Sequence, residues 1–303
     1  MSLLYNRFKF YLKFDKEVFS QSFPSFIIRS VLGNELKQFA CILKRKQCEF
    51  CPLKFSCAYS YVFETPIKKD TTFLAGRDKG MHPFTIYTDR DVKQSFDTLE
   101  LTLTLIGKGI EYFPYIFYAL LKAGEKGLFR ERMPYKIDKI ESVDDNIVVY
   151  DGKDEALNLI EPKKYQFNDA LSCDFNGKLS LHFLSPIRIK VNGQYTDKLT
   201  YKDILINAAR RLSVLESMYG SGEEVKFSLK NMSEKKSLDS FRWVDYQRFS
   251  ARQSSEMKLG GVKGEIEVEG EFASTELSIL EGIEIFGLGK NTSFGFGKVK
   301  VKR

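Results

Sequence analysis

The chain has no long apolar run and no uncharged N-terminal core. Its densest apolar stretch, Tyr112 to Leu121, is about half of the length that a membrane-spanning helix needs, and it contains Pro114. Arg7 and Lys9 interrupt the N-terminal segment, which a signal peptide would keep uncharged. The sequence therefore predicts a cytoplasmic protein that has no membrane as a partner.

The composition excludes an intrinsically disordered chain and leaves nucleic acid open as a partner. Hydrophobic residues make up 43% of the 303 residues and charged residues 29%, which is enough apolar material for folded cores. At roughly 150 residues per domain, this length predicts two domains. The formal net charge is +7, a mild basic excess that permits an RNA or DNA partner without demonstrating one.

Hydrophobic periodicity predicts a similar alternation of strands with two helices in each half of the chain. Alternating apolar residues predict strands, and apolar residues at helical spacing predict helices. In the first half we expect a strand over residues 4–14, a helix over 26–43, a strand over 99–105, a helix over 111–123, and strands over 135–140 and 147–150. In the second half we expect a strand over 179–191, a helix over 201–219, strands over 239–249 and 262–272, a helix over 274–285 and a strand at 299–301.

This order of elements predicts an α+β fold of two tandem ferredoxin-like domains, each a βαββαβ unit. The polar stretch 151–177, which contains glycine and proline, separates the two patterns. The predicted N-terminal domain is therefore residues 1–160, and the predicted C-terminal domain is residues 170–303. The halves share the pattern of elements and no evident sequence repeat.

Four of the five cysteines lie close together, at Cys41, Cys48, Cys51 and Cys57, with the spacing C-x6-C-x2-C-x5-C. Disulfides are rare in a reducing cytosol, whereas four thiolates can close a tetrahedral zinc site or hold an iron–sulfur cluster. The sequence therefore predicts a cysteine-rich metal-binding insertion in the first domain. The site is expected to be structural, because four protein ligands leave no open position. The alternative is four small buried side chains that are adjacent by chance.

Residues 287–297 read Gly-Leu-Gly-Lys-Asn-Thr-Ser-Phe-Gly-Phe-Gly, and we call them the glycine loop. Glycine permits positive φ angles and a close approach of the backbone to a ligand. Freed N–H groups, the Lys290 ammonium and the hydroxyls of Thr292 and Ser293 then suit phosphate oxygens. The alternative is a glycine-rich turn that joins a helix to an edge strand.

This pattern of glycines around one basic residue resembles the glycine-rich loop of RAMP-superfamily proteins, which are CRISPR-associated, bind RNA and have RRM-like, ferredoxin-like domains. Other segments resemble one branch of that superfamily, the endoribonuclease that cuts precursor CRISPR RNA (the sixth-numbered Cas family). Among these segments are Cys51-Pro-Leu-Lys-Phe-Ser-Cys57, Phe183-Leu-Ser-Pro-Ile-Arg-Ile-Lys190 and Trp243-Val-Asp-Tyr-Gln-Arg-Phe-Ser250. The resemblance spans nearly the whole chain.

The resemblance implies a metal-independent endoribonuclease that binds CRISPR repeat RNA and cuts the precursor to guide RNA. In this family the ribose 2′-hydroxyl attacks the adjacent phosphate and leaves a 2′,3′-cyclic phosphate. The implied partners are repeat RNA and, as an open question, other Cas proteins of an effector or adaptation complex; no cofactor is implied for catalysis. The RNA-binding residues that it implies are Gly287, Gly289, Lys290, Asn291, Gly295, Gly297, Arg248, Arg252 and Gln253.

Members of this family commonly use a first-helix histidine, and Asn34 stands at that position here. An amide cannot exchange a proton near neutral pH, so the catalytic groups must lie elsewhere. The candidates are His82, Lys37, and Tyr59 or Tyr61. His82 is either a proton-transfer group or a turn residue beside Pro83, and Lys37 either neutralises the pentavalent phosphate or is a solvated helix lysine.

The asparagine keeps a second function open, a non-cleaving subunit that holds guide RNA within a CRISPR effector complex. A third is an iron–sulfur redox protein that uses the four cysteines. Further basic residues are compatible with RNA in either of the first two cases. We expect Arg210 and Arg211 on the polar side of their helix. We also expect phosphate contact along the last strand, with affinity falling as salt rises, because it has a basic face of Lys298, Lys300, Lys302 and Arg303.

Overall fold

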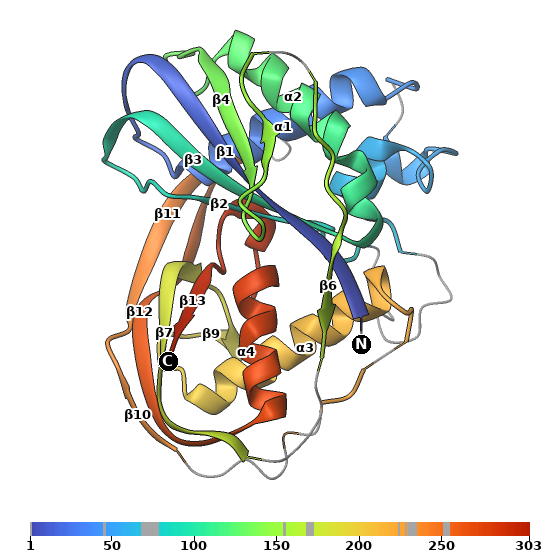
Figure 1. Ribbon diagram of the computed structural model, residues 1–303. Coiled ribbons are helices and arrows are strands. Elements are labelled where there is room, and N and C mark those ends of the chain that lie inside the picture. Colours follow the sequence, from blue (N-terminus) through green and yellow to red (C-terminus); the bar gives the residue numbers. More distant parts are fainter. Residues whose placement is uncertain are drawn as a thin grey trace. The chain divides into compact units, whose positions relative to one another are not determined.

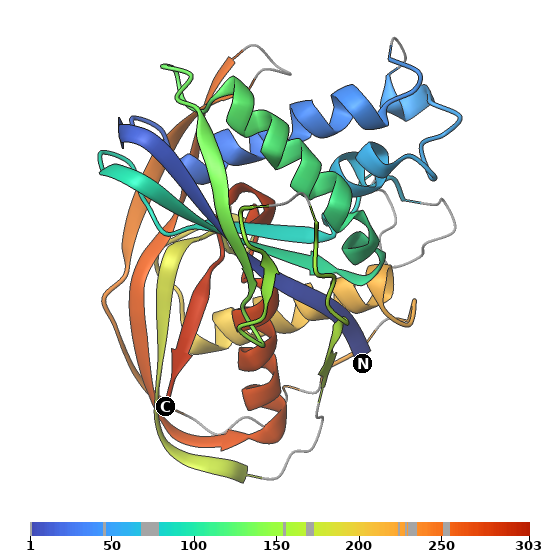
Figure 2. The ribbon, with the colours of Figure 1, turned by 45° about the horizontal axis from the view of Figure 1, so that its top comes forward.

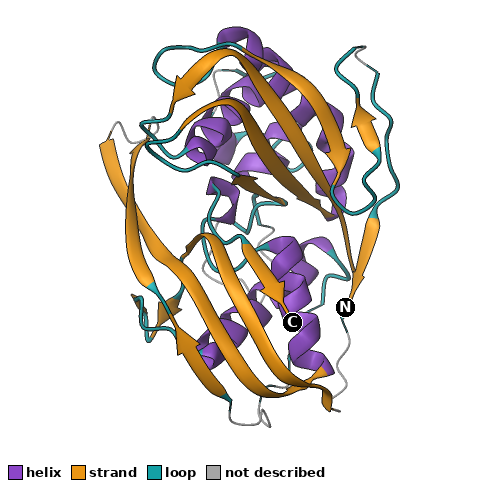
Figure 3. Ribbon diagram, turned by 60° about the vertical axis from the view of Figure 1, so that its left-hand side comes forward, coloured by secondary structure: helices purple, strands orange, loops and turns teal. Residues whose placement is uncertain are grey.

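The structure, a computed structural model, describes residues 2–44, 47–67, 79–153, 156–167, 173–223, 225–227, 229, 235–250 and 255–303. Within these residues the chain forms two compact units. The N-terminal unit is Leu4–Lys163, and the C-terminal unit is Lys164–Arg303 together with Met1–Leu3. In the described part of each unit, an antiparallel sheet is combined with two α-helices that pack side by side (Figures 2 and 3).

The N-terminal unit has a sheet with the strand order β2–β3–β1–β4–β5, in which neighbours are antiparallel (Figure 1). Its elements are β1 (Ser2–Phe19), α1 (Pro24–Ala40), η1 (Cys48–Phe50), η2 (Ser60–Glu64), β2 (Phe84–Thr88), β3 (Ser95–Ile106), η4 (Gly107–Tyr112), α2 (Phe113–Lys126), β4 (Tyr135–Ser142) and β5 (Val148–Tyr150). The succession β1–α1–β2–β3–α2–β4 with this pairing is a ferredoxin-like arrangement.

Alternating large side chains of β1 and β3 form the centre of the N-terminal core. Phe8, Phe10 and Leu12 are buried, and they pair in register with the buried leucines of β3. The ring of Phe113, the first residue of α2, stacks on Phe8 with ring centroids 3.9 Å apart. The alternation read from the sequence is therefore confirmed for the central part of β1 and for β3.

Three details of this unit differ from the sequence predictions. Leu4 was expected on the buried face of β1 and is exposed, because the side chains that face inward change phase before Phe8. α2 continues through Gly124, where a stop was predicted; a Cβ there would lie 2.4 Å from the Tyr135 carbonyl oxygen, so this glycine allows close packing on β4. The helix ends instead at Gly127, with φ +81. β2 was not predicted at all.

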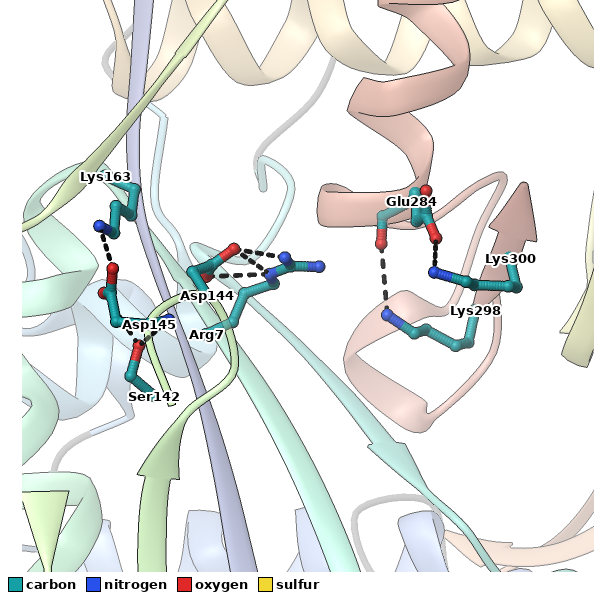
Figure 4. A network of polar contacts seen from close by, with 8 residues as sticks. All are labelled: Arg7, Ser142, Asp144, Asp145, Lys163, Glu284, Lys298 and Lys300. Carbon is teal, nitrogen blue, oxygen red and sulfur yellow. Dashed lines mark hydrogen bonds and ion pairs between the residues drawn. The ribbon is translucent and has the colours of Figure 1, made fainter. Parts of the chain in front are cut away.

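Two acidic residues follow β4, and each is paired with a basic residue (Figure 4). Arg7 Nε donates to both carboxylate oxygens of Asp144 at 3.1 Å. Lys163 donates to Asp145, and this hydrogen bond lowers the pKa of the Asp145 carboxyl. The two pairs connect β1 and the end of the N-terminal unit to the turn after β4.

The C-terminal unit repeats the arrangement, with the strand order β10–β12–β7–β13 and β11 also paired to β12. Its elements are β6 (Lys163–Gln166), β7 (Cys173–Ile187), β8 (Lys190–Val191), β9 (Gln194–Tyr195), α3 (Tyr201–Tyr219), β10 (Lys236–Asp239), β11 (Arg242–Ser250), β12 (Ser255–Ala273), α4 (Ser274–Phe286), η5 (Thr292–Phe294) and β13 (Val299–Lys302). β7, α3, β12, α4 and β13 occupy the positions that the βαββαβ pattern predicts.

The helices of this unit have clear local causes. α3 has the predicted bounds, and a capping box starts it: Thr200 Oγ1 accepts from Asp203 N at 3.1 Å while Asp203 Oδ2 accepts from Thr200 N at 3.0 Å. α4 begins at Ser274, as predicted, and its N-cap residue is Ala273. None of the helices in the described residues combines the length and the apolar character that crossing a membrane requires.

A short hairpin, β8–β9, stands apart from the main sheet. Its turn is Asn192–Gly193, and both residues have positive φ, +50 and +82. Asn-Gly in this conformation is the preferred two-residue hairpin turn. The Asn-Gly dipeptide is therefore a hairpin signal in the sequence. It was not used in the prediction, which placed residues 179–191 in a single strand.

Candidate functional site

The glycine loop joins the end of α4 to the edge strand β13. Gly287 caps α4 with φ +79, and Gly289, Gly295 and Gly297 also have positive φ. Asn291 has φ +65, a conformation that asparagine tolerates better than most residues. The prediction that the glycines serve positive φ angles is therefore confirmed.

The close approaches of this loop are to the chain's own backbone. A Cβ at Gly289 would lie 2.6 Å from the Arg188 carbonyl oxygen, and one at Gly297 would lie 2.5 Å from the Leu288 carbonyl oxygen. Lys290 N donates to Arg188 O at 2.9 Å, so the loop is bound to the chain that follows β7. Tight internal packing, rather than the approach of a ligand, accounts for these two glycines.

Seven of the eleven amide groups of the loop donate to carbonyl oxygens, and three others form no hydrogen bond within the described residues. Donors to protein carbonyls are the N–H groups of Gly287, Leu288, Lys290, Phe294, Gly295, Phe296 and Gly297. Within the described residues, no hydrogen bond is formed by the N–H groups of Gly289, Asn291 and Thr292. The expectation of freed donors therefore narrows to these three amides. They flank Lys290, whose side chain is exposed.

Arg211 supports the loop from beneath, which corrects its predicted place on the polar side of α3. Its side chain is 5% exposed. Nε and Nη2 donate to the Phe286 carbonyl oxygen at 3.2 and 2.9 Å, and Nη2 also donates to Thr292 Oγ1 at 2.8 Å. The guanidinium thus satisfies a carbonyl at the end of α4, where helices leave such groups unpaired. Burial lowers the pKa of Arg211 to about 10, so the group still carries its positive charge near neutral pH.

Arg248, a predicted RNA-binding residue on β11, is brought to the same loop. Its guanidinium carbon lies 4.3 Å from the centroid of the Phe294 ring. Burial lowers the pKa of Arg248. The neighbouring ring of Tyr246 lies edge-on to Phe296, with centroids 6.0 Å apart. Arg252 and Gln253, which were also predicted to bind RNA, lie outside the described residues.

The last strand is less available for phosphate than predicted. Figure 4 shows Lys300 and Lys298 directed at Glu284 of α4. Lys300 Nζ lies 2.7 Å from Glu284 Oε1, and Lys298 Nζ donates to the Glu284 carbonyl oxygen at 3.2 Å. Because both ammonium groups already have oxygen partners, a phosphate would have to displace those contacts.

In the N-terminal unit, two of the predicted catalytic residues meet. The Lys37 ammonium, on α1, lies 5.4 Å from the centroid of the Tyr59 ring. Tyr59 in turn stacks on Phe63, with centroids 5.6 Å apart. Phe63 fits against α1 at Gly33, where a Cβ would lie 2.9 Å from the ring. Asn34, next to that glycine, is exposed on the same helix.

His82 meets a residue that the sequence analysis did not consider, Arg29 of α1. Arg29 Nη2 lies 3.0 Å from His82 Nε2. A guanidinium only donates, so Nε2 is the acceptor and the ring proton of a neutral His82 lies on Nδ1. The Arg29 guanidinium also lies 5.0 Å from the centroid of the Phe63 ring. Phe63 therefore connects the His82–Arg29 pair with the Lys37–Tyr59 pair along α1.

Tyr61, the other tyrosine proposed as a proton donor, lies in a different environment. Its ring is 5.3 Å from that of Tyr112. Burial, followed by the nearby Tyr112 and Glu111, raises the pKa of Tyr61 to about 12. A phenol that holds its proton this firmly is a weaker acid than an ordinary tyrosine, which favours Tyr59 of the two.

The four clustered cysteines are free thiols, with Cys41 buried and the others partly buried. Burial, then the charge of Glu64, raises the pKa of the Cys48 thiol. In the described residues, no group of three or more His, Cys, Asp or Glu side chains converges as metal ligands would. As placed, these thiols do not form a ligand set, and the zinc or iron–sulfur site stays a prediction. Metal analysis and an absorbance spectrum of anaerobically purified protein test it.

Comparison with known families covers nearly all of the chain. A family described as an N-terminal domain matches residues 3–163. The family described as CRISPR-associated endoribonuclease Cas6 matches residues 181–299, which include the glycine loop. Over residues 181–299 the chain is therefore similar to the Cas6 proteins of CRISPR systems. A relative described as an uncharacterized protein of Archaeoglobus fulgidus is 23% identical to this chain over 296 residues, covering 92% of this chain and 94% of the relative.

Solved structures of Cas6 proteins have the same fold. Thermus thermophilus Cas6 is 14% identical, has a TM-score of 0.53 and covers 99% of both chains. A structure described as a Cas6 product complex is 15% identical with the same TM-score and coverage. A partial Cas6-RT-Cas1–Cas2 complex has a TM-score of 0.56 at 14% identity, covering 99% of this chain and 46% of that one. At these identities the likeness establishes the fold alone.

Proposed function

We propose that the protein binds the repeat segments of CRISPR transcripts and cuts them to guide RNA without a metal ion. The match of residues 181–299 to the Cas6 endoribonuclease family supports RNA binding and processing in general. The observation that carries the proposal is the glycine loop, in which three amides and the exposed Lys290 lie above the buried positive charge of Arg211. Backbone donors and fixed positive charge are what phosphate oxygens require.

The proposed reaction is a transesterification at one phosphodiester. The 2′-oxygen loses its proton and bonds to phosphorus, the bond from phosphorus to the 5′-oxygen breaks, and that oxygen takes up a proton. The products are a 2′,3′-cyclic phosphate and a 5′-hydroxyl. The reaction therefore needs a base, an acid, and positive charge beside the pentavalent phosphorus.

We assign these tasks to the residues that Phe63 connects along α1. Lys37 supplies positive charge, and Tyr59, which it contacts, supplies a proton to the leaving oxygen. His82 transfers the proton of the 2′-hydroxyl through Nε2, which accepts only after it exchanges its contact with Arg29 for one with the substrate. Lysine and tyrosine side chains do not ordinarily titrate near neutral pH, so a site that worked without His82 is expected to cut slowly.

The alternative is a subunit that holds guide RNA without cutting it. Asn34 favours this alternative, because it stands at the position where the family commonly has its histidine and it cannot transfer a proton. Association with other Cas proteins is a further proposal, supported by the occurrence of a similar fold in a Cas6-RT-Cas1–Cas2 complex.

One experiment separates the two functions. The purified protein is incubated with its cognate repeat RNA in EDTA, and the products are resolved and treated with a phosphatase that opens cyclic phosphates. A 2′,3′-cyclic phosphate product that is lost in Lys37→Ala supports cutting. The matched control is Lys54→Ala, because Lys54 is also a partly exposed lysine of the N-terminal unit. A tight shift of intact RNA supports the binding subunit. Absence of any complex at low salt would refute both functions.

A further inference from the structure

The β8–β9 hairpin gathers three cations around one tyrosine. The guanidinium carbon of Arg188 lies 3.8 Å from the centroid of the Tyr195 ring. The ammonium groups of Lys190 and Lys290 lie 5.0 and 6.0 Å from the same centroid. Two segments that are distant in the sequence thus meet: the exit of β7 with the hairpin that follows it, and the glycine loop. We call Arg188, Lys190, Lys290 and Tyr195 the Tyr195 cluster.

The backbone holds this cluster in place. Lys290 N donates to the Arg188 carbonyl oxygen at 2.9 Å, so the residues that carry two of the cations are hydrogen-bonded to each other. The Arg188 guanidinium also donates to the Gly260 carbonyl oxygen on β12. Tyr195 pairs with Lys190 across the hairpin, which the Asn192–Gly193 turn closes. The convergence therefore does not depend on flexible side chains alone.

The cluster carries uncompensated positive charge. In the part of the chain that the structure describes, no carboxylate is paired with Arg188, Lys190 or Lys290. Burial by itself raises the pKa of Tyr195, but the hydrogen bond from Arg188 and the charges of Lys290, Arg188 and Lys190 outweigh it, so the pKa is lowered. Like charges held together repel each other, and a bound anion relieves that repulsion.

We infer that the Tyr195 cluster is a phosphodiester-binding site that holds the RNA backbone next to the glycine loop. This inference rests on the proposed function and extends the RNA contact to β8–β9, a hairpin outside the loop. Arg188 and the two lysines contact phosphate oxygens, and the Tyr195 ring keeps the Arg188 guanidinium in position by stacking. Lys190 is exposed, so a polymer can reach the cluster from solvent.

The test measures binding of 2′-O-methylated repeat RNA, which lacks the attacking hydroxyl, over a range of salt concentrations. The variants are Lys190→Ala and the double change Lys190→Ala with Lys290→Ala. The matched control is Lys178→Ala with Lys236→Ala, which removes the same charge from two exposed lysines that both pair in register with Glu269. Lys178 lies about ten residues before Arg188 on β7, which is roughly 33 Å away at the rise of a strand.

The double variant is expected to bind more than tenfold more weakly than the wild type. The slope of log affinity against log salt concentration is expected to become shallower by about 1.4, which corresponds to the loss of two phosphate contacts. The control should keep the wild-type slope. Tyr195→Phe keeps the ring and should bind within about twofold of the wild type, whereas Tyr195→Ala should lose about fivefold or more.

Two results overturn the inference, and they are distinguishable. If the wild type binds RNA but Lys190→Ala and Tyr195→Ala bind with unchanged affinity and slope, the hairpin does not contact RNA while the proposed function stands. If the wild type itself does not bind repeat RNA at low salt, the proposed function fails and the inference falls with it. Circular dichroism of each variant checks that the fold is intact. We expect it to be intact because Lys190 and Lys290 are exposed.

Discussion

The glycine loop and the face of α1 that carries Lys37 differ in what holds their residues in place. In the loop, hydrogen bonds of the backbone, positive φ angles and the buried Arg211 determine the conformation. On α1, the candidate residues are connected by rings and by one contact between Arg29 and His82. A site fixed by its backbone tolerates little change in sequence, whereas a site of stacked side chains can exchange its members.

The largest expected effect tests whether Arg211 organises the loop. Arg211→Met leaves the Phe286 carbonyl without its buried donor, so we expect a loss of about 3 kcal/mol in the free energy of unfolding. RNA affinity should fall with it. Urea denaturation measures the loss, and Arg210→Met on the exposed side of α3 should stay within about 0.5 kcal/mol of the wild type. Equal stability of the two variants would show that the loop is not held from beneath.

The next effect concerns the α1 face. His82→Ala should lower the rate of cutting at least ~10²-fold if His82 transfers a proton. His82→Gln preserves an acceptor for Arg29 and removes the proton transfer, so it should be equally slow. Single-turnover cleavage of repeat RNA measures both rates. A fast glutamine variant beside a slow alanine variant would make His82 a positioning residue for Arg29.

Two glycines allow the energetic cost of backbone strain to be distinguished from the cost of losing close packing. Gly289 and Gly193 both have positive φ, +76 and +82, but an added Cβ meets the Arg188 carbonyl oxygen at 2.6 Å in the first case and nothing within 4 Å in the second. Gly289→Ala should therefore cost about 2–3 kcal/mol and Gly193→Ala about 1 kcal/mol in the free energy of unfolding. Thermal and urea unfolding compare the two, and equal costs would mean that the loop moves away from β7 without penalty.

The smallest effect concerns binding alone. Lys290→Ala together with Gly295→Ala should weaken binding of repeat RNA by more than about tenfold, because it removes an exposed charge and strains a residue with φ +92. Fluorescence anisotropy at fixed salt measures the affinity. Unchanged affinity would remove the glycine loop from the RNA-binding surface and leave the α1 face as the region to examine.

The sequence could predict elements whose signal is local. α3 has its predicted bounds because its apolar spacing and the Thr200–Asp203 capping box are both written within about twenty residues. The positive φ angles of the glycine loop follow from glycine itself. β2 was missed because its five residues carry too short a pattern to distinguish from a loop. The β8–β9 hairpin had a usable signal in Asn192–Gly193.

The sequence by itself determined the four long helices and most of the strands, the location of the loop between α4 and β13, and an asparagine at position 34. Only the tertiary structure decided that Arg211 is buried, that Arg29 meets His82, and that Arg188, Lys190 and Lys290 converge on Tyr195. The reason is physical. Periodicity reports which face of an element is apolar, whereas a polar side chain is placed by partners that are distant in the chain and come together only when the sheet has formed.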